Sequence, residues 1–358
     1  MNLQEDPHRR YPPLAGEWVL VSPHRAKRPW QGRTEHSTAE LGPSYDPSCY
    51  LCPGNCRAGG IKNPDYQETF VFLNDFSALL PDVAGGKIDE GGLFRAKSER
   101  GICKVVCFSP RHDLTIALMD VSAIRGVVDV WEKEYRLLGE ESYINYVQIF
   151  KNRGLMMGCS NPHPHGQIWS TETVPELPSK EKEMQGDYLS KKGSCLLCDY
   201  LKEEESRGER VVISNDSFTA LVPFWAVWPF EVLVLPRRHV SSIAELGDSE
   251  KNDLASLIKR LGTRFDNLFF THFPYSMGLH QKPTEEKVVR IFSEAFGTTV
   301  EVELSSLEAR DGETGSSSVL GEGNCRLLSS KRIQYRGIFR LREQRGGDGL
   351  RSQLLRFF

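Results

Sequence analysis

Apolar residues recur at helical spacing in two stretches of the chain and form short runs elsewhere. The spacing in 121–138 and in 248–262 predicts a helix in each stretch. Short apolar runs bounded by Pro, Asn or Asp are typical of strands. These runs lie at 18–23, 71–81, 144–150, 212–223 and 267–273. The pattern therefore predicts both helices and strands.

The order of these elements repeats along the chain. Each half contains a Cys-x-x-Cys pair, a strand ending in Asn-Asp, a strand ending in Pro-Arg-His or Pro-Arg-Arg-His, a helix and a further strand. Such self-similarity indicates an internal duplication. We expect an α+β protein of two tandem units, each an antiparallel sheet with helices packed on it. The first unit spans 1–175. The second spans 176–280 and is incomplete, because it lacks a counterpart of 158–169, and 281–358 form a poorly ordered basic tail.

Composition narrows the class of protein. The chain has 358 residues, of which 39% are apolar and 26% charged, as in globular proteins. The formal charge of −3 argues against a protein that coats nucleic acid. The most apolar stretch, 224–235, is too short to span a bilayer, and the N-terminus lacks the apolar core of a secretory signal. We therefore expect a soluble, cytoplasmic protein that binds neither nucleic acid nor membrane.

The segment 326–358 differs from the rest of the chain in charge. It contains nine Lys or Arg and two Asp or Glu, a net charge of +7, so residues 1–325 carry −10. A basic end of this kind is usually a solvated tail. An arm for an anionic partner is the alternative, and no nucleic-acid-binding motif accompanies it.

The sequence His163-Pro-His165-Gly-Gln167 carries the strongest chemical signal. Alternation along a strand places His163, His165 and Gln167 on one face. The imidazole of His165 is a nucleophile that can attack an α-phosphorus and hold a nucleotidyl group covalently. Gln167 can only hydrogen-bond a phosphoryl oxygen, which favours transfer over hydrolysis. The sequence therefore predicts a nucleotidyl-transfer centre.

Groups able to bind phosphate precede this segment. Gly154 and Gly158 form a Gly-rich turn whose backbone N–H groups can bind phosphate. Ser160 and Asn152 could donate hydrogen bonds to phosphoryl oxygens. A polar strand facing solvent is the structural alternative, but such a strand would not need Gly and Pro between its polar positions.

Nine cysteines, an odd number, in a reducing compartment indicate metal ligands or buried thiols rather than a disulfide framework. Two thiolates and two imidazoles make a tetrahedral zinc site. The predicted ligands are Cys49, Cys52, His112 and His163. Unligated buried cysteine is the alternative.

The duplication offers a second metal site. Cys195, Cys198 and His239 repeat the pattern of the first site. Its fourth ligand stays open at this point, with His280 and His272 as candidates.

Two further segments could bind a nucleotide. Arg25 and Arg28 lie in a basic run that could bind phosphates, although a solvated charge run is the usual reason for such a pattern. Asn74, Asp75 and Phe76 offer an aromatic wall and groups able to hold ribose hydroxyls. The alternative there is an Asx turn after a strand.

These motifs together resemble the galactose-1-phosphate uridylyltransferase family, in the His-x-His-x-Gln transferase branch of the histidine-triad superfamily. The resemblance covers about residues 10 to 280. It rests on HRAKRPW (24–30), CYLC (49–52), FVFLNDFSAL (70–79), GCSNPHPHGQIW (158–169), VPFWAVWPFEVLVLPRRHV (222–240) and FPYSMGLH (273–280). It implies that both units are histidine-triad-like.

The resemblance also implies an activity and site roles. In the family, UDP-glucose gives its uridylyl group to a histidine, galactose 1-phosphate then takes it, and the enzyme is a homodimer. By position, His165 matches the nucleophile, and Gln167 and Ser160 match groups that hold the α-phosphoryl group. The binding roles fall on Arg25, Arg28 and Asn152 for phosphate, on Asn74, Asp75 and Phe76 for uridine, on Gly158 in the loop, and on Cys49, Cys52, His112 and His163 for zinc.

The chain departs from the family pattern near its end. Glu181, which has Glu183 close by, and His280 match two ligands of a second, structural iron or zinc site. Family members continue with a His-rich strand that supplies the other two ligands, and then with a Lys and a Gln that contact substrate. None of this follows Gln281. An altered reading frame or a retained intron would give such a tail. We therefore expect a second site that lacks ligands, and uridylylation as the surviving half-reaction.

Two other functions remain open from the sequence alone. The first is a related phosphorylase-type transferase that acts on adenylyl sugars or dinucleoside polyphosphates, because the HPHGQ motif does not separate these substrates. The second is a catalytically impaired variant that binds nucleotide or pairs with an intact subunit. The uridine-pocket residues favour the uridylyltransferase over the former, and an intact His165 favours it over the latter.

Overall fold

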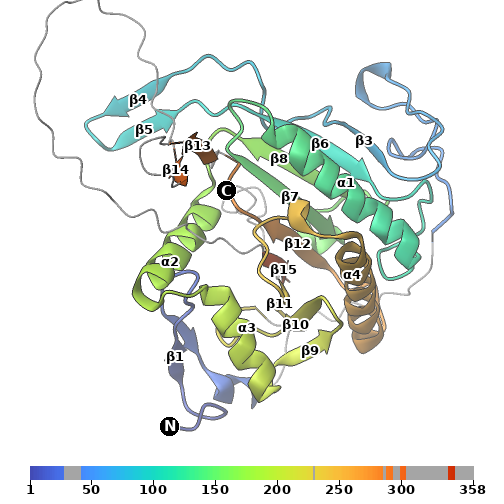
Figure 1. Cartoon of the computed structure of the whole chain (residues 1–358). Helices are drawn as coiled ribbons and strands as arrows, with labels where there is room; N and C mark the ends of the chain where they lie inside the picture. Colours follow the sequence, from blue (N-terminus) through green and yellow to red (C-terminus); the bar gives the residue numbers. More distant parts are fainter. Residues whose placement is uncertain (28–41, 229, 285–287, 293–298, 304–337, 343–358) are drawn as a thin grey trace, which may run out of the picture.

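The structure is a computed structural model that describes residues 1–27, 42–228, 230–284, 288–292, 299–303 and 338–342. Within them the chain forms a nine-stranded antiparallel sheet, three two-stranded sheets and four α-helices (Figure 1). The prediction of an α+β protein with antiparallel sheets is confirmed.

The elements have the following bounds. The main sheet contains, in spatial order, β3 (Phe70–Leu73), β6 (Gly101–Cys107), β8 (His165–Thr171), β7 (Tyr146–Arg153), β12 (Tyr275–His280), β15 (Ile338–Arg342), β11 (Val232–Pro236), β10 (Phe218–Leu221) and β9 (Val211–Ser214). The two-stranded sheets are β1 (His8–Arg10) with β2 (Val19–Val21), β4 (Lys87–Glu90) with β5 (Phe94–Lys97), and β13 (Val288–Phe292) with β14 (Thr299–Glu303). The helices are α1 (Val121–Gly139), α2 (Glu176–Lys192), α3 (Leu196–Arg207) and α4 (Asp248–Phe269).

The strands of the two predicted units are arranged with approximate twofold symmetry in the main sheet. Its two halves meet where β7 pairs with β12, with Phe150 opposite Gly278 and Lys151 opposite Met277. On one side of this pair lie β8, β6 and β3, and on the other lie β15, β11, β10 and β9. The two predicted units therefore share one continuous sheet.

β15 lies between β12 and β11, which is the position that β8 holds between β7 and β6. Its register sets Phe339 opposite both Val234 and Leu279. The sequence predicts no strand for this position and assigns residues 281–358 to a tail. A strand from far along the chain fills it, while most of that tail lies outside the described residues.

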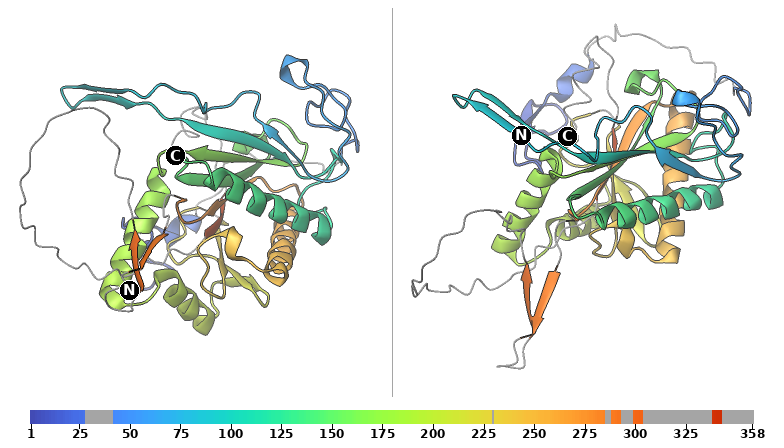
Figure 2. Two further views of the ribbon diagram at one scale, coloured as in Figure 1. Left: turned by 45° about the horizontal axis from the view of Figure 1, so that its top comes forward. Right: turned by 90° about the horizontal axis from the view of Figure 1, so that it is seen from above.

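Helices α1 and α4 lie side by side and cover one face of the sheet (Figures 1 and 2). The predicted helices over 121–138 and 248–262 are confirmed. Ile124, Val128 and Trp131 of α1 recur three to four residues apart, and they are buried against Leu254 and Leu261 of α4. Each such aliphatic side chain contributes about 1.5–3 kcal/mol when fully buried. This packing leaves the opposite face of the sheet for the polar residues of β8.

The strand predicted over 267–273 does not form. Helix α4 continues to Phe269, and the strand is β12, beginning at Tyr275. Phe265 and Phe269 lie one helical turn apart, and both rings stack on Phe273, with centroids 4.9 and 4.8 Å away. The helical spacing of these aromatic residues prevails over their preference for strands. Phe270, at a φ of 52°, then ends the helix.

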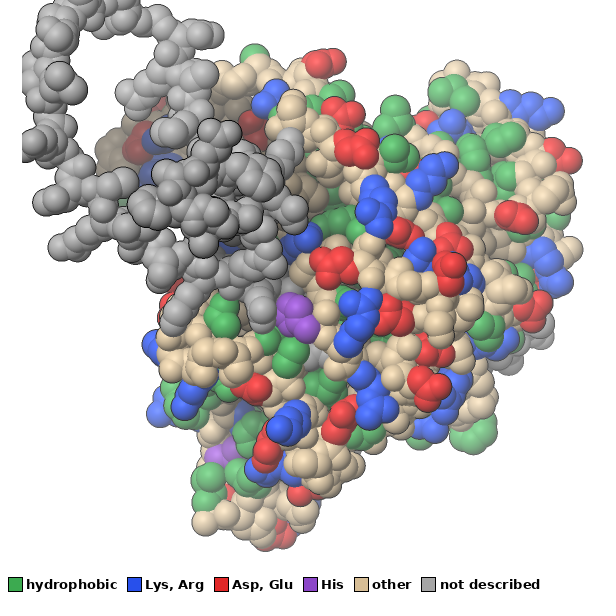
Figure 3. All heavy atoms as spheres, viewed as in Figure 1, with side chains coloured by type: hydrophobic (Ala, Val, Ile, Leu, Met, Phe, Trp, Pro, Cys, Tyr) green, Lys and Arg blue, Asp and Glu red, His purple; other side chains and the backbone are tan. Residues whose placement is uncertain are grey.

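One face of the molecule carries charges of both signs. On the face shown in Figure 3, acidic and basic side chains are interspersed over α1 and α4, in agreement with a formal charge of only −3. Among the helices of the described residues, none has both the length and the apolar character needed to cross a bilayer.

Candidate active site and metal centre

Strand β8 positions the predicted nucleophile. It pairs with β6 and β7, so that His165 lies opposite Cys107 and Gln167 lies opposite both Val105 and Phe150. Residues paired across antiparallel strands share a face. His165 and Gln167 therefore point away from α1 and α4, whereas Ile168 belongs to the helix-covered core.

Contacts within the fold account for Gly166 and Pro164 in this segment. A Cβ on Gly166 would lie 2.8 Å from the Phe108 ring and 3.0 Å from the carbonyl oxygen of Phe150. The Pro164 carbonyl oxygen accepts a hydrogen bond from Phe108 N–H at 2.8 Å. Gly166 is thus set by close packing on the core side.

The imidazole of His165 is held as a neutral ring with one free nitrogen. Its Nδ1 lies 2.7 Å from the carbonyl oxygen of His163. A carbonyl oxygen only accepts, so Nδ1 carries the proton and Nε2 keeps its lone pair. Burial, with the ammonium of Lys151 as the second cause, lowers the pKa of His165 to about 4. At neutral pH the ring is therefore uncharged, the form that a nucleophile requires.

The other predicted phosphoryl-binding groups lie on or just before β8 and on β7. The Gln167 side chain accepts a hydrogen bond from Trp169 Nε1 at 3.0 Å, and Asn152 accepts one from Ser276 Oγ at 2.6 Å. Ser160 is exposed, and so is Gly158, which adopts a φ of 74° after a short 3-10 turn. These residues come from two adjacent strands and the loop between them.

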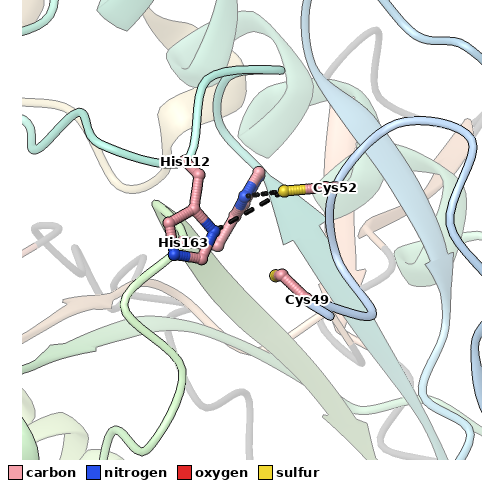
Figure 4. Close-up of side chains that lie close together, drawn as sticks. All are labelled: Cys49, Cys52, His112 and His163. Atoms are coloured by element: carbon pink, nitrogen blue, oxygen red, sulfur yellow. Dashed lines mark hydrogen bonds between the residues drawn. The ribbon is translucent and has the colours of Figure 1, made fainter. Parts of the chain in front are cut away.

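The structure brings the four predicted metal ligands together (Figure 4). The ligand atoms of Cys49, Cys52, His112 and His163 lie within 4.8 Å of one another, and all four residues are buried. Cys52 Sγ lies 3.5 Å from His112 Nδ1 and 3.6 Å from His163 Nδ1. The sequence places His163 on one face with His165, but β8 begins only at His165. His163 precedes the strand, with its N–H bonded to Asn161 Oδ1, and its ring turns into the cluster.

The donor set fits a metal ion. The Nε2 atom of His163 lies 2.9 Å from the carbonyl oxygen of Ser109, which leaves Nδ1 as the lone pair facing Cys52. This hydrogen bond is the outer contact that orients metal-binding imidazoles. Burial raises the pKa of Cys52 to about 11, so a thiolate at this position requires a cation. Two sulfur and two nitrogen donors at this spacing suit a tetrahedral ion.

The turn after β3 holds the predicted nucleoside-binding residues. Asn74 Oδ1 accepts the N–H of Phe76 at 3.0 Å, so the Asx turn that the sequence allows is present. The Phe76 side chain is 83% exposed and has room for a base to stack. Phe72 on β3 and Gln167 on β8 flank Val105 and share its face. The turn thus lies two strands, roughly 10 Å, from β8 on the same sheet.

The N-terminal arginines are only partly described. Arg25 is exposed in a 3-10 helix, Pro23–Lys27, that follows β2. Arg28 lies outside the described residues. The phosphate-binding role of both arginines therefore stays a prediction.

The second cysteine cluster also assembles. Cys195 and Cys198 lie at the start of α3, His239 follows β11, and their ligand atoms lie within 4.8 Å of one another. Hydrogen bonding to Cys198, opposed by burial and aided by His239, lowers the pKa of Cys195 to about 4. His272 instead pairs with Asp266, so it does not complete this cluster.

Glu181 and His280 form a separate pair. Glu181 is fully buried on α2, and its Oε2 lies 2.8 Å from Nδ1 of His280 at the end of β12. His280 therefore belongs with Glu181 rather than with Cys195 and Cys198. Among the described residues, no further metal-ligating group joins this pair.

The sequence analysis does not single out three residues that lie near the site. Lys151 is buried, contacts the His165 carbonyl oxygen at 3.2 Å, and has a pKa lowered by burial to about 8. Arg57 forms an ion pair with Asp75 at 2.7 Å and lies over the Phe72 ring. Trp169 contacts Gln167. Only alternation along β8 could have indicated Trp169, since it shares a face with Gln167.

Comparison with known proteins identifies the family. Residues 1–175 match the model of the galactose-1-phosphate uridyl transferase N-terminal domain, and residues 181–297 match that of the C-terminal domain. The chain is 52% identical over 279 residues to the galactose-1-phosphate uridylyltransferase of Haemophilus influenzae, covering 78% of this chain and 79% of the relative. It is 50% identical to that of Rattus norvegicus, covering 78% and 73%.

Solved structures agree at the level of the fold. An ADP-glucose phosphorylase from Arabidopsis thaliana with bound ADP-glucose superposes at a TM-score of 0.66, with 22% identity, over 96% of this chain and 91% of that one. A uridylyltransferase structure gives 0.62 with 24% identity, over 94% and 86%. Taken with the matches in sequence, these findings show that the chain belongs to the galactose-1-phosphate uridylyltransferase family.

Proposed function

We propose that this enzyme transfers a uridylyl group from UDP-glucose to galactose 1-phosphate through a covalent uridylyl-His165 intermediate. The observation that carries the proposal is the neutral imidazole of His165. Its Nδ1 proton is held by the His163 carbonyl oxygen, which leaves Nε2 free to attack. The names of the relatives support the substrate class.

In the first half-reaction, the Nε2 lone pair of His165 attacks the α-phosphorus of UDP-glucose and forms an N–P bond. The bond from that phosphorus to the bridging oxygen breaks, and its electron pair leaves on glucose 1-phosphate. In the second, a phosphate oxygen of galactose 1-phosphate attacks the same phosphorus. The N–P bond then breaks, UDP-galactose forms, and the Nε2 lone pair is restored.

The neighbouring polar groups would stabilise the charge that develops on the phosphoryl oxygens. We assign Gln167, Ser160 and Asn152 to this role, together with the N–H groups of the loop at Gly158. Gln167 cannot accept or release a proton, so no acid–base residue at this position activates water. The site therefore favours transfer over hydrolysis.

The nucleotide would extend from His165 toward the turn after β3. Asn74 and Asp75 would hold the ribose hydroxyls, and Phe76 would stack on the uracil ring. The span of two strands between this turn and β8 agrees with the length of a nucleoside monophosphate. Arg25 and Arg28 are assigned to the phosphates by resemblance alone.

We propose that Cys49, Cys52, His112 and His163 bind zinc. When bound, zinc supplies a structural crosslink that fixes His163, and thereby the carbonyl oxygen that orients His165. Both ring nitrogens of His163 are engaged, one by Cys52 and the other by the Ser109 carbonyl oxygen, so we assign this cluster no part in the transfer itself.

We also propose a second zinc ion at Cys195, Cys198 and His239, because three donors lie within 4.8 Å there. The alternative, an iron or zinc ion at Glu181 and His280, has two donors among the described residues. Metal analysis of the parent, Cys52→Ser and Cys198→Ser separates the two. We expect about two ions per chain in the parent and about one in each variant. An unchanged ratio in Cys198→Ser would remove the second zinc site.

The decisive experiment is intact-protein mass spectrometry after addition of UDP-glucose. The parent should gain the mass of one uridylyl group, labile to acid, whereas His165→Ala should gain none. His272→Ala is the matched control and should label like the parent. An unlabelled, folded, zinc-loaded parent would contradict the proposal and favour an impaired variant.

Substrate choice and turnover follow from the same assay. ADP-glucose in place of UDP-glucose tests the adenylyl-transfer alternative, and faster labelling by ADP-glucose would favour it. Formation of UDP-galactose from galactose 1-phosphate tests the second half-reaction. Labelling without UDP-galactose would place a defect in the second half-reaction, as expected if the residues after Gln281 replace a substrate-binding segment.

We further propose that the protein is cytoplasmic and that two copies of the chain form a homodimer. Each copy would contain the units 1–175 and 176–280. The family resemblance supports both proposals. A reducing compartment would keep the clustered thiols available as ligands, and none of the eight described cysteines forms a disulfide. Light scattering on the purified protein tests the dimer. A monomer at micromolar concentration would contradict it.

A further inference from the structure

Gln167 and Trp169 lie two residues apart on β8, so their side chains emerge on the same face of the strand. The indole Nε1 of Trp169 lies 3.0 Å from the side-chain oxygen of Gln167. An indole N–H can donate but cannot accept. The atom of the amide that faces Trp169 must therefore be the oxygen.

The indole itself is held in place. Its ring meets Phe150 edge to face, with centroids 5.6 Å apart and an angle of 79° between the rings. Phe150 is the residue on β7 that lies opposite Gln167. The three side chains thus form a compact group across two strands, and the indole cannot turn without losing its contact with Phe150.

This arrangement decides which end of the Gln167 amide is free. With its oxygen engaged by Trp169, the amide presents its NH2 group elsewhere, as a donor. If the amide flipped, NH2 would face the indole N–H, and two donors would oppose each other. Phosphoryl oxygens are acceptors, so only the observed orientation can hold them.

The side-chain amide of Asn152, the second amide of the candidate site, is oriented in the same way. Ser276 Oγ lies 2.6 Å from Asn152 Oδ1, which engages the oxygen of that amide as well. Asn152 and Gln167 therefore both present NH2 groups, and each is set by a neighbour that needs no contact with substrate.

We propose that Trp169 is a positioning residue that fixes the Gln167 amide so that its NH2 group donates to the transferred phosphoryl group. This inference rests on the proposed function and deepens it. Trp169 touches neither the reacting phosphorus nor the nucleophile, and it acts through the orientation of Gln167.

The test is a double-mutant cycle on the rate of His165 uridylylation in a single turnover. Trp169→Phe removes the N–H and keeps an aromatic ring against Phe150. We expect it to slow labelling about tenfold, the effect of one hydrogen bond. In a Gln167→Ala background, the same substitution should have no further effect. Trp225→Phe, in a separate buried cluster, is the matched control and should label at the parental rate.

A structural role would give a different result. If Trp169 only supports packing, its substitution slows labelling by the same factor with or without Gln167, and that outcome overturns the inference. A parental rate in Trp169→Phe also overturns it. Should Trp169→Phe fail to fold, replacing Trp169 by 3-benzothienylalanine keeps the ring shape without the N–H and carries the same expectation.

The inference and the proposed function fail in distinguishable ways. A parent that UDP-glucose does not label overturns the proposed function, and this inference with it. A labelled parent whose Trp169 variants behave independently of Gln167 overturns the inference alone.

Discussion

At the scale of single residues, the candidate site depends on how polar atoms are oriented. His165 is set by a carbonyl oxygen, Gln167 by an indole N–H and Asn152 by a serine hydroxyl. In each case a neighbour engages one polar atom of the side chain and leaves the other available to a ligand. Such orientation removes the need to rearrange dipoles during the reaction, which is how electrostatic catalysis becomes effective.

Arg57 gives a residue-scale prediction for nucleotide binding. Its side chain is 9% exposed, it pairs with Asp75 at 2.7 Å, and its guanidinium lies 4.0 Å from the centre of the Phe72 ring. Arg57→Met removes the charge and leaves Asp75 free to move. We expect the dissociation constant for UMP, measured by calorimetry, to rise about tenfold.

The control for Arg57 is Arg95→Met. Arg95 also pairs with an aspartate, Asp89, but on an exposed hairpin. Its substitution should leave UMP binding unchanged, because exposed pairs contribute little. If Arg57→Met bound UMP as tightly as the parent, the ion pair with Arg57 would not be needed to hold Asp75 in place for UMP binding.

At the scale of elements, strand β8 depends on a close approach to its neighbours. Gly166→Ala would place a methyl group 2.8 Å from the Phe108 ring and 3.0 Å from the Phe150 carbonyl oxygen. We expect a loss of about 1–3 kcal/mol in the free energy of unfolding, measured with denaturant. Uridylylation should slow too, because the strand that carries His165 shifts.

Gly126 provides the matched substitution on an element that has room. A Cβ at Gly126 in α1 meets no atom within 4 Å. Gly126→Ala should stabilise the protein by up to about 1 kcal/mol through helix propensity. If both alanines shifted stability in the same direction, packing around Gly166 would not be the cause.

The contact between α1 and α4 gives a prediction about pH. Burial opposes ionisation of Glu132, but hydrogen bonds from Lys251 and Arg136 prevail and lower its pKa from 4.5. The carboxylate therefore stabilises the fold above pH 4.5, and this contribution is lost as the pH falls through the lowered pKa. Glu132→Gln should cost about 1 kcal/mol at pH 7.

The difference between Glu132→Gln and the parent should shrink as the pH falls through the lowered pKa of Glu132, because the protonated carboxyl is neutral like the glutamine amide. Denaturant titrations at a series of pH values measure it. Glu68→Gln changes an exposed carboxyl and serves as the control. A Glu132 effect that is constant with pH would mean that the ion pair is not its source.

At the scale of the whole molecule, the two halves form one sheet through β7 and β12. Residues 1–175 expressed alone would expose the edge of β7 along its full length. Exposed strand edges pair with other chains, so we expect this fragment to aggregate. Analytical ultracentrifugation measures the aggregation. Co-expression with residues 176–358 should restore solubility. A soluble, monomeric fragment would show that each half folds independently.

The sequence by itself determined the features that depend on local spacing. Helical periodicity located α1 and α4, the repeat indicated two related halves, and the cysteine and histidine spacings named both clusters that the structure assembles. These features can be predicted because helical periodicity and metal-ligand spacing are patterns among residues that lie a few positions apart in the sequence.

Only the tertiary structure decided the rest. Helix α4 extends to Phe269, within the strand predicted over 267–273, and Phe265 and Phe269 stack on Phe273 beyond its end. The pairs Arg57–Asp75 and Asn152–Ser276 join positions 18 and 124 residues apart, and β15 enters the sheet from near the end of the chain. Contacts between distant residues carry no periodic signal along the chain, because they are set by which surfaces meet after folding.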